Sequence, residues 1–437
     1  MSEPAAPTLD WEGCGFATRQ VHAGETEDLT HGARITPVHL SAAYRFASFQ
    51  EAADRFSGAD LGHLYSRNAN PTNQVAERRL ASLEGGSGAL VVGSGQAAIT
   101  MALLGLAGEG EHIISTASIY SGTRVLFDRS FRRLGVTVEY LWDPSDEDEW
   151  ERLIRPETKA IFTETLPNPK NDVVDIAAVA RIANRHGIPL VVDNTIGTPF
   201  LIRPFEHGAH IVVHSATKFL SGHGANLAGA IVDGGTFDWA ASDRPYPGIT
   251  ATPFSTHPSY VDAFGPRAFE QYLRFGIAND TGPALSPLNG FLLHQGMETL
   301  SVRMRQHIAS AREIAEWLEG QERVESVDYA GLASHPQHAL AIRDYGGLPG
   351  SVFSFTVRGG AEGAERFFDA LRVFSRMTNI GDTRSMALHS ATTTHSGFTQ
   401  ETRDRLGIAD GLVRLSIGLE DAADLIADLD QALRVAV

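Results

Sequence analysis

Short apolar runs alternate with amphipathic segments through the middle of the chain. The runs are rich in Val, Ile and Leu and too short for helices, so they predict buried strands at 89–92, 112–116, 136–141, 160–163, 190–193 and 211–214. Helical patterns are predicted at 71–83, 97–106, 125–134 and 176–186. This alternation predicts an α/β fold with a mostly parallel sheet flanked by helices. In such a fold, ligands bind at the carboxyl ends of the strands.

The pattern changes on both sides of this region. Residues 1–66 are polar and irregular apart from a helix predicted at 49–56, and we interpret them as an N-terminal arm. Residues 67–290 form the predicted large domain, with an insertion rich in Gly, Pro, Ser and Thr at 234–288. A long helix predicted over 286–305 leads into a smaller C-terminal α/β domain, 291–437. Its predicted strands and helices are 351–357, 364–371, 413–418 and 422–435.

Charge and cysteine content exclude several classes of function. The chain has 36 Lys and Arg against 53 Asp and Glu, a net charge of −17, which argues against nucleic acid or an anionic membrane as a partner. No apolar run of about 20 residues predicts a membrane span. The single cysteine, Cys14, cannot form an intrachain disulfide or a cysteine metal site, and we expect no metal. The acidic N-terminus does not resemble a signal peptide, so we expect a cytoplasmic protein.

Two of the predicted strands end at residues suited to a reactive cofactor. Lys218 follows one strand in the segment His-Ser-Ala-Thr-Lys, where Ser215 and Thr217 offer hydroxyls to a phosphate. A lysine nucleophile requires an electrophilic carbonyl, although a surface lysine would fit the same short motif. Asp193 ends another strand, and a buried carboxylate needs a partner such as a protonated pyridine nitrogen. The alternative for Asp193 is a helix cap.

A glycine loop lies between the first predicted strand and its helix. Gly95 and Gln96 would direct backbone N–H groups at a phosphate from a helix N-terminus. The dinucleotide fingerprint needs a third glycine where Ile99 stands. A nucleotide-binding regulatory protein is therefore a disfavoured alternative, and a plain helix-start loop remains open.

Three further polar residues follow or interrupt predicted strands. Tyr120 could stack on a planar ring and transfer protons, and Asn168 could donate a hydrogen bond to a ring oxygen. Arg414 stands inside an apolar strand and needs an anion. A substrate carboxylate is one such partner, and a structural salt bridge is the alternative.

Taken together, these motifs resemble those of the Cys/Met-metabolism family of fold-type I pyridoxal-phosphate (PLP) enzymes, from residue 34 to residue 420. The resemblance implies that Lys218 forms a Schiff base with PLP, that Asp193 pairs with the ring nitrogen and that Tyr120 stacks on the ring. It assigns the phosphate to Gly95, Gln96, Ser215 and Thr217, and the substrate to Arg414 and Asn379.

The resemblance also implies an oligomer. In this family a Tyr-x-Arg motif in the arm reaches the cofactor phosphate of the neighbouring subunit, and Tyr65 and Arg67 match that motif. We therefore expect a homo-oligomer, specifically a tetramer of two active-site dimers.

Within the family, the chain is most similar to the branch that exchanges the acetoxy group of O-acetylhomoserine for sulfide or methanethiol. The long insertion, the segment 285–293 and Asn379, where lyases and cystathionine synthases usually have serine, carry this likeness. Gly122 stands where methionine γ-lyase has cysteine. The implied reaction is γ-replacement giving homocysteine or methionine, with Lys218 and Tyr120 carrying protons. Cystathionine γ-synthase and γ-lyase chemistry remain alternatives.

Overall fold

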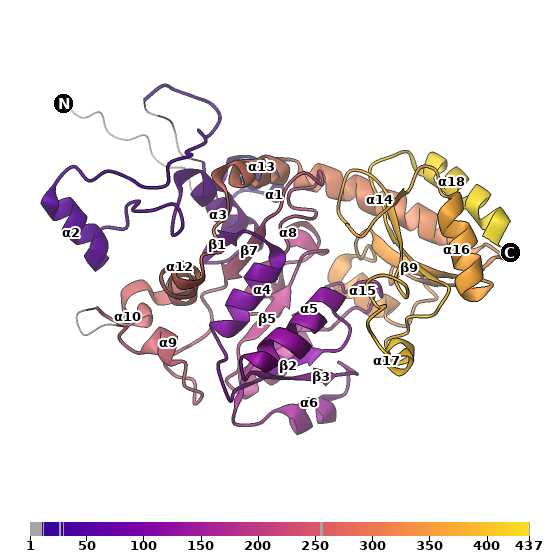
Figure 1. The fold of residues 1–437 in the computed structure, drawn as a ribbon, viewed down its shortest axis with the longest axis horizontal. Helices are drawn as coiled ribbons and strands as arrows, with labels where there is room; N and C mark the ends of the chain where they lie inside the picture. The colour runs from indigo at the N-terminus through magenta and orange to yellow at the C-terminus, as the bar shows by residue number, and fades with distance from the viewer. Residues whose placement is uncertain (1–10, 12, 26–27, 29, 254–256, 437) are drawn as a thin grey trace.

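The structure is a computed structural model that describes residues 11, 13–25, 28, 30–253 and 257–436. The chain forms two lobes, each built on its own sheet (Figure 1). A seven-stranded sheet organises the first lobe and a five-stranded sheet the second. The first ten residues of the predicted arm lie outside the described residues.

The large sheet is mostly parallel, as predicted. Its strand order is β1-β7-β6-β5-β4-β2-β3, and only β7 runs against its neighbours. The strands are β1 (Gly88–Val92), β2 (His112–Thr116), β3 (Thr137–Leu141), β4 (Thr158–Glu164), β5 (Leu190–Asp193), β6 (Ile211–His214) and β7 (Gly229–Asp233). The prediction omitted β7, whose antiparallel pairing with β1 and β6 completes the sheet.

Helices cover both faces of this sheet, so its strands are buried on both sides. On β5, Leu190 and Val192 pack into one apolar core and Val191 into another, because successive side chains of a strand point to opposite faces. The flanking helices are α3 (Pro71–Glu84), α4 (Gly95–Leu104), α5 (Ser121–Val125) with η1 (Leu126–Phe131), α6 (Glu147–Leu153), α7 (Ile176–Arg185), α8 (Thr198–Leu201) and η2 (Pro204–His207). The helix predicted at 125–134 therefore begins earlier, at Ser121, and contains a π-helical turn.

Helix α3 shows how local sequence sets a boundary. Asn70 caps its start by accepting a hydrogen bond from the Thr72 N–H at 2.9 Å, and Pro71 occupies the first turn. Gly85 ends the helix with φ of 81°, a left-handed conformation that glycine adopts without strain.

The insertion 234–288 folds into a series of short helices joined by loops. It contains α9 (Pro247–Thr250), α10 (Tyr260–Phe264), η3 (Gly265–Arg267), α11 (Ala268–Tyr272), η4 (Leu273–Ile277) and α12 (Ala278–Thr281). Its aromatic side chains pack together, with the rings of Trp239 and Phe269 stacked at 5.4 Å. The segment is thus part of the core that covers the sheet.

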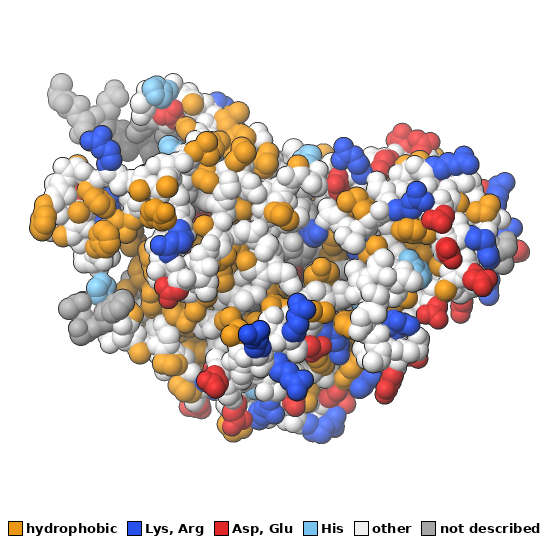
Figure 2. All heavy atoms as spheres, in the orientation of Figure 1, with side chains coloured by type: hydrophobic (Ala, Val, Ile, Leu, Met, Phe, Trp, Pro, Cys, Tyr) orange, Lys and Arg blue, Asp and Glu red, His pale blue; other side chains and the backbone are white. Residues whose placement is uncertain are grey.

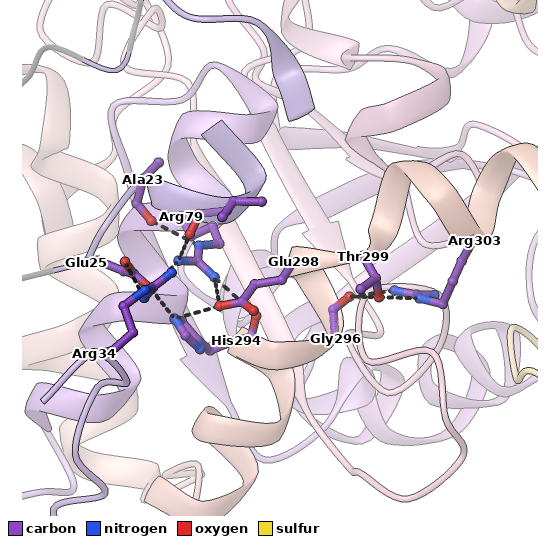
Figure 3. A network of polar contacts seen from close by, with 10 residues as sticks. Ala23, Glu25, Arg34, Arg79, His294, Gly296, Glu298, Thr299 and Arg303 are labelled. Carbon is purple, nitrogen blue, oxygen red and sulfur yellow. Dashed lines mark hydrogen bonds and ion pairs between the residues drawn. The ribbon is translucent and has the colours of Figure 1, made fainter. Parts of the chain in front are cut away.

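The prediction of a single helix over 286–305 is wrong. Two helices, α13 (Pro287–Glu298) and α14 (Leu300–Glu319), meet at Thr299. Figure 3 shows the Arg303 side chain bonded across this break to the Gly296 carbonyl at 2.7 Å and to Thr299 Oγ1 at 3.1 Å. A Cβ atom on Gly296 would lie 2.4 Å from the Ser221 carbonyl oxygen. Residue 296 must therefore be a glycine for α13 to pack this closely against the loop after Lys218.

The second lobe has the strand order β10-β11-β12-β9-β8. Its strands are β8 (Val324–Asp328), β9 (Val352–Val357), β10 (Ser375–Arg376), β11 (Met386–His389) and β12 (Leu412–Ser416). Its helices besides α14 are α15 (His338–Tyr345), α16 (Gly360–Ala370), α17 (Gln400–Arg405) and α18 (Ala422–Ala436). The prediction placed β9, α16, β12 and α18 but omitted the others. The boundary predicted at residue 290 falls within α13, and the domain division stays a prediction.

Part of the predicted arm is fixed to the first lobe. Helix α1 (Phe16–His22) packs against α3, α13 and α14, and the buried Arg79 donates to the carbonyls of Val21 at 2.9 Å and Ala23 at 3.0 Å. Figure 3 shows the same guanidinium beside the carboxylates of Glu25 and Glu298. The first described part of the arm is thus ordered by a buried arginine.

A cluster beside Arg79 contains residue types that bind metal ions. Ligand atoms of Glu25, His294 and Glu298 lie within 4.8 Å of one another. Arg34 pairs with Glu25 at 3.2 Å and Arg79 with Glu298 at 3.3 Å, so both carboxylates are already neutralised (Figure 3). The cluster is therefore an ion-pair network rather than a cation site.

The rest of the arm extends away from the first lobe. Helix α2 (Phe49–Ser57) projects at the edge of the molecule, with Phe49 90% and Phe56 73% exposed (Figure 1). Figure 2 shows hydrophobic side chains gathered over this arm and the adjoining surface. Among the described residues, no helix is both long enough and apolar enough to span a bilayer.

Candidate active site

A cavity of about 230 Å³ opens at the carboxyl ends of the parallel strands. The first lobe supplies most of its lining, and the second closes it with residues 378–380, 394 and 414. Ten of the sequence-predicted site residues line this single space: Gly95, Gln96, Tyr120, Asn168, Asp193, Ser215, Thr217, Lys218, Asn379 and Arg414. Strand ends of the α/β sheet therefore converge as the pattern predicted.

Lys218 follows β6 and projects into the cavity. Its Nζ atom lies 2.5 Å from Oδ1 of Asn379, a residue of the second lobe. Burial, together with the nearby positive charge of Arg414, lowers the pKa of the Lys218 amine to about 8. Burial therefore favours the neutral, nucleophilic form of this amine.

Arg414 lies within β12 and is only 2% exposed. One terminal nitrogen donates to the carbonyl of Asn379 at 2.9 Å and the other to Oδ1 of Asn168 at 3.4 Å. Its Nε has no hydrogen-bond partner, and it forms no ion pair with any described carboxylate. Burial lowers the pKa of this guanidinium to about 10. A buried cation without an anion is suited to a ligand carboxylate.

Asp193 ends β5 with its carboxylate in the cavity. Its Oδ1 accepts a hydrogen bond from the Thr195 N–H at 2.9 Å. Burial raises the pKa of Asp193, although the hydrogen bonds from Thr195 and the nearby His214 oppose that shift. No described cation pairs with this carboxylate, so a cationic group on a ligand would stabilise it by forming an ion pair.

The start of α4 forms the predicted anion cradle. Ser94 caps the helix by accepting from the Ala97 N–H at 3.2 Å, which leaves the first N–H groups of the helix directed at the cavity. A Cβ atom on Gly95 would lie 2.6 Å from Cβ of Ser215, so only glycine allows the two segments to approach this closely. The Thr217 hydroxyl already exchanges hydrogen bonds with the backbone of Ala228. Ser215 is thus the freer of the two hydroxyls.

Tyr120 directly precedes α5, at its N-cap position, and is half-exposed in the cavity lining. Its backbone N–H donates to Oε1 of Glu164 at 2.7 Å. A Cβ atom on Gly122 would lie 2.4 Å from the Tyr120 ring, so the absence of a side chain at 122 permits this ring position.

Tyr65 and Arg67 lie outside the cavity of their own chain. The Arg67 guanidinium sits 5.5 Å from the centre of the Tyr65 ring and donates to Oδ1 of Asn279 on α12 at 2.8 Å. The structure therefore separates these two residues from the other predicted site residues within one subunit.

Some residues at the site were missed from sequence. Glu164, which ends β4, lines the cavity, but no role was predicted for it from the sequence. Its position at the end of a strand, like that of Asp193, could have identified it as a site residue. Behind Asp193, the fully buried His214 and Glu84 are in contact at 2.6 Å, and Asn194 also donates to Glu84 at 3.0 Å. The other missed lining residues are Ser94, Ile99, Leu166, Thr195, Ile196, Leu227, Thr378, Ile380 and Thr394.

The lining fits a phosphorylated pyridine aldehyde. The N–H groups at the α4 start suit its phosphate, the unpaired Asp193 suits a protonated ring nitrogen, and the Lys218 amine suits its aldehyde. Arg414 remains available for the carboxylate of an amino-acid substrate.

Comparisons with known proteins agree with this fit. Residues 17–434 match the family described as Cys/Met metabolism PLP-dependent enzyme. The chain is similar to the O-acetyl-L-homoserine sulfhydrylase of Corynebacterium glutamicum, with 44% identity over 95% of this chain and 96% of that protein. It is also similar to the L-methionine gamma-lyase of Pseudomonas putida, with 40% identity over 96% and 97% of the two chains.

A solved structure shares the fold. The crystal structure of a Campylobacter jejuni protein assigned as an O-acetylhomoserine (thiol)-lyase superposes with a TM-score of 0.92 at 36% identity, covering 96% of this chain and 99% of that one. That crystal structure carries an N'-pyridoxyl-lysine-5'-monophosphate. A nucleotide-binding regulatory protein is therefore not supported. The chain belongs to the Cys/Met-metabolism family of PLP-dependent enzymes, with the fold-type I architecture expected from its sequence.

Proposed function

We propose that this enzyme catalyses γ-replacement on O-acetyl-L-homoserine. Sulfide or methanethiol is the nucleophile, and the products are homocysteine or methionine and acetate. The observation that carries this proposal is the buried, unpaired Arg414 in the same cavity as Lys218, because it provides for an amino-acid carboxylate beside a nucleophilic amine. The likeness to an O-acetyl-L-homoserine sulfhydrylase supports the choice of ester.

Each residue has a proposed role in this reaction. When bound, PLP withdraws electrons from the substrate carbons next to it. Lys218, its amine oriented by Asn379, removes a proton from Cα of the substrate and, once that proton has left the amine, removes one from Cβ. Protons return to Cβ and Cα after the nucleophile has added. The bond between Cγ and the acetoxy oxygen breaks, acetate leaves, and a carbon–sulfur bond forms at Cγ. Tyr120, in the cavity lining, assists the proton transfers.

The cofactor-binding roles remain proposals on the same geometry. We assign the phosphate to Gly95, Gln96, Ser215 and Thr217, and the ring to Tyr120, Asn168 and Asp193, because these residues share one cavity. Among the described residues, Lys218 and Arg414 are the cations that line it. Within one subunit neither is left for the distal carboxylate of a succinyl ester, and Leu166, Ile196 and Leu227 add apolar side chains to the lining. An unpaired buried carboxylate is costly, which favours the acetyl ester.

We also propose that the enzyme is a homo-oligomer, a tetramer of two active-site dimers. Tyr65 and Arg67 stand away from their own cavity, and the apolar face of α2 is exposed. In an oligomer, Tyr65 and Arg67 would enter the cavity of a partner subunit. The surface of that subunit would cover Phe49 and Phe56. The expected cytoplasmic location stays a prediction based on cysteine content.

One assay tests the function directly. Purified protein is incubated with O-acetylhomoserine, O-succinylhomoserine or O-acetylserine, each with sulfide, and homocysteine and cysteine are measured. We expect homocysteine mainly from O-acetylhomoserine, and none from Lys218→Ala protein. Formation of 2-oxobutyrate and ammonia from methionine or cystathionine, without homocysteine from the ester, would instead identify a γ-lyase.

A further inference from the structure

Two carboxyl side chains end neighbouring strands and face the same cavity. Glu164 on β4 and Asp193 on β5 are partners in the parallel register, and neighbouring strands lie about 4.8 Å apart. Both residues line the cavity and are buried, with 5% and 8% of their surfaces exposed. The roles proposed above use Asp193 and leave Glu164 without one.

The surroundings provide little positive charge for this pair. Neither carboxyl forms an ion pair within the part of the chain that the structure describes. Across the cavity, Lys218 is bonded to Asn379, and Arg414 to backbone carbonyls and Asn168. His214, on β6 behind Asp193, is paired with Glu84 at 2.6 Å.

Each carboxyl accepts a backbone hydrogen bond, but their surroundings shift the two pKa values to different extents. Glu164 accepts one from the Tyr120 N–H at 2.7 Å, and Asp193 accepts one from the Thr195 N–H at 2.9 Å. Burial, followed by repulsion from Asp193, raises the pKa of Glu164 well above its ordinary value. The pKa of Asp193 is also raised by burial, but Thr195 and His214 oppose that shift.

Adjacent buried carboxyls cannot both ionise unless two positive charges accompany them. One protonated pyridine nitrogen neutralises one carboxylate, and Asp193 is the better stabilised anion of the two. A second negative charge on Glu164 would remain buried and unpaired, which is strongly unfavourable. The proton therefore belongs on Glu164.

We propose that Glu164 is held as a neutral carboxylic acid that positions the cofactor pocket. Its Oε1 accepts the Tyr120 N–H and so fixes the start of α5, and its O–H is a hydrogen-bond donor in the cavity. Its neutrality leaves Asp193 as the single negative charge of the pair. This inference rests on the role proposed above for Asp193.

Infrared difference spectroscopy of the holoenzyme tests the protonation state directly. We expect the carbonyl stretch of a protonated carboxylic acid that shifts in D₂O and is lost in Glu164→Gln protein. Glu313→Gln, at an exposed position on α14, is the matched control and should keep the band. Absence of any such band from the wild-type holoenzyme near neutral pH would overturn the proposal.

A spectral titration gives a second readout that does not depend on turnover. The midpoint pH of the cofactor's visible band, near about 420 nm, responds to nearby charge. Glu164→Gln and Glu164→Leu both keep the position neutral, so each should move the midpoint by less than about 0.3 units. If Glu164 were ionised, each substitution would lower the midpoint by about one unit or more. Glu164→Leu should weaken cofactor affinity about tenfold through its lost hydrogen bonds.

Asp193→Asn separates failure of this inference from failure of the proposed site. That variant should lower both the midpoint and the cofactor affinity, because it removes the pair's single charge. If Asp193→Asn has no effect on either quantity, the role proposed for Asp193 is wrong. If Asp193→Asn behaves as expected while the Glu164 substitutions lower the midpoint, only the neutral state of Glu164 is wrong.

Discussion

The Nζ atom of Lys218 lies 2.5 Å from Oδ1 of Asn379, across the boundary between the two lobes. Lys218 follows β6, an interior strand of the large sheet, and Asn379 lies between β10 and β11 of the small sheet. Arg414 reaches the same point from β12 through the Asn379 carbonyl at 2.9 Å. The proposed base and the proposed carboxylate site are therefore held together by one residue of the second lobe.

Replacing Lys218 should stabilise the cofactor-free protein. Its amine has a pKa of about 8 in the fold, against an ordinary value of 10.5. Below pH 8 the buried Lys218 amine lowers the free energy of unfolding by its full amount. This destabilisation disappears as pH rises from about 8 to about 10.5, because in that range the unfolded chain binds more protons than the folded protein. We expect Lys218→Met apoprotein to be more stable than wild-type apoprotein by about 2–3 kcal/mol at pH 7 in urea unfolding. The difference should shrink above pH 10; equal stability at pH 7 would contradict the buried-amine account.

Arg414→Gln should impair substrate binding and leave the cofactor in place. Losing a buried guanidinium that pairs with a carboxylate costs about 2–5 kcal/mol, so kcat/KM for O-acetylhomoserine should fall at least about 30-fold, mostly through KM. Arg414→Lys should not rescue it, because lysine lacks the bidentate geometry. Arg434→Gln, at an exposed position on α18, is the control and should behave as wild type. An unchanged KM in Arg414→Gln would show that the carboxylate binds elsewhere.

Gly95→Ala should weaken cofactor binding. The added Cβ would meet Ser215 at 2.6 Å, forcing apart the two segments that form the anion cradle. Overpacking of this kind predicts an affinity loss of about tenfold or more, measured by fluorescence titration of apoprotein. Gly108→Ala is the matched control, because its Cβ would find only the Glu111 carboxylate at 3.8 Å. Equal affinities for the two variants would contradict the tight cradle.

Subunit mixing should reveal whether the arm completes a partner's site. Arg67→Ala and Lys218→Ala proteins are each expected to be nearly inactive. If the arm acts on the neighbouring subunit, a hybrid dimer has one site with both residues intact and one site with both replaced. Half of randomly mixed dimers are hybrids and half of their sites are intact, so equal mixing should restore about a quarter of wild-type activity. Full activity of Arg67→Ala alone, or no recovery after demonstrated subunit exchange, would place the arm outside the site.

Much of the first lobe follows from local patterns. The predicted strands at 112–116, 190–193 and 211–214 have the same boundaries as β2, β5 and β6, because buried strands of a parallel sheet are continuous apolar runs. The prediction failed where packing overrides propensity. Residues 286–305 are helical in character throughout, yet they form two helices that meet at Thr299, where Arg303 bonds to Gly296 and to the Phe219 carbonyl of the loop after Lys218. The β7 strand was omitted although residues 230–232 form an apolar run like those of the predicted strands, and its pairing with β1 and β6 became evident only in the tertiary structure.

The chain's own sequence determined the α/β alternation and the residue types at the strand ends, since each depends on a few neighbouring positions, and the family resemblance, since it combines such local motifs along the chain. Only the tertiary structure decided which of those residues share a cavity. Arg414 and Asn168 are 246 residues apart, and no local pattern specifies their contact. The same holds for the pairing of Glu164 with Asp193 and for the distance of Arg67 from its own cavity. Such relations arise from strand register and from the docking of two lobes, which the whole packed core determines together.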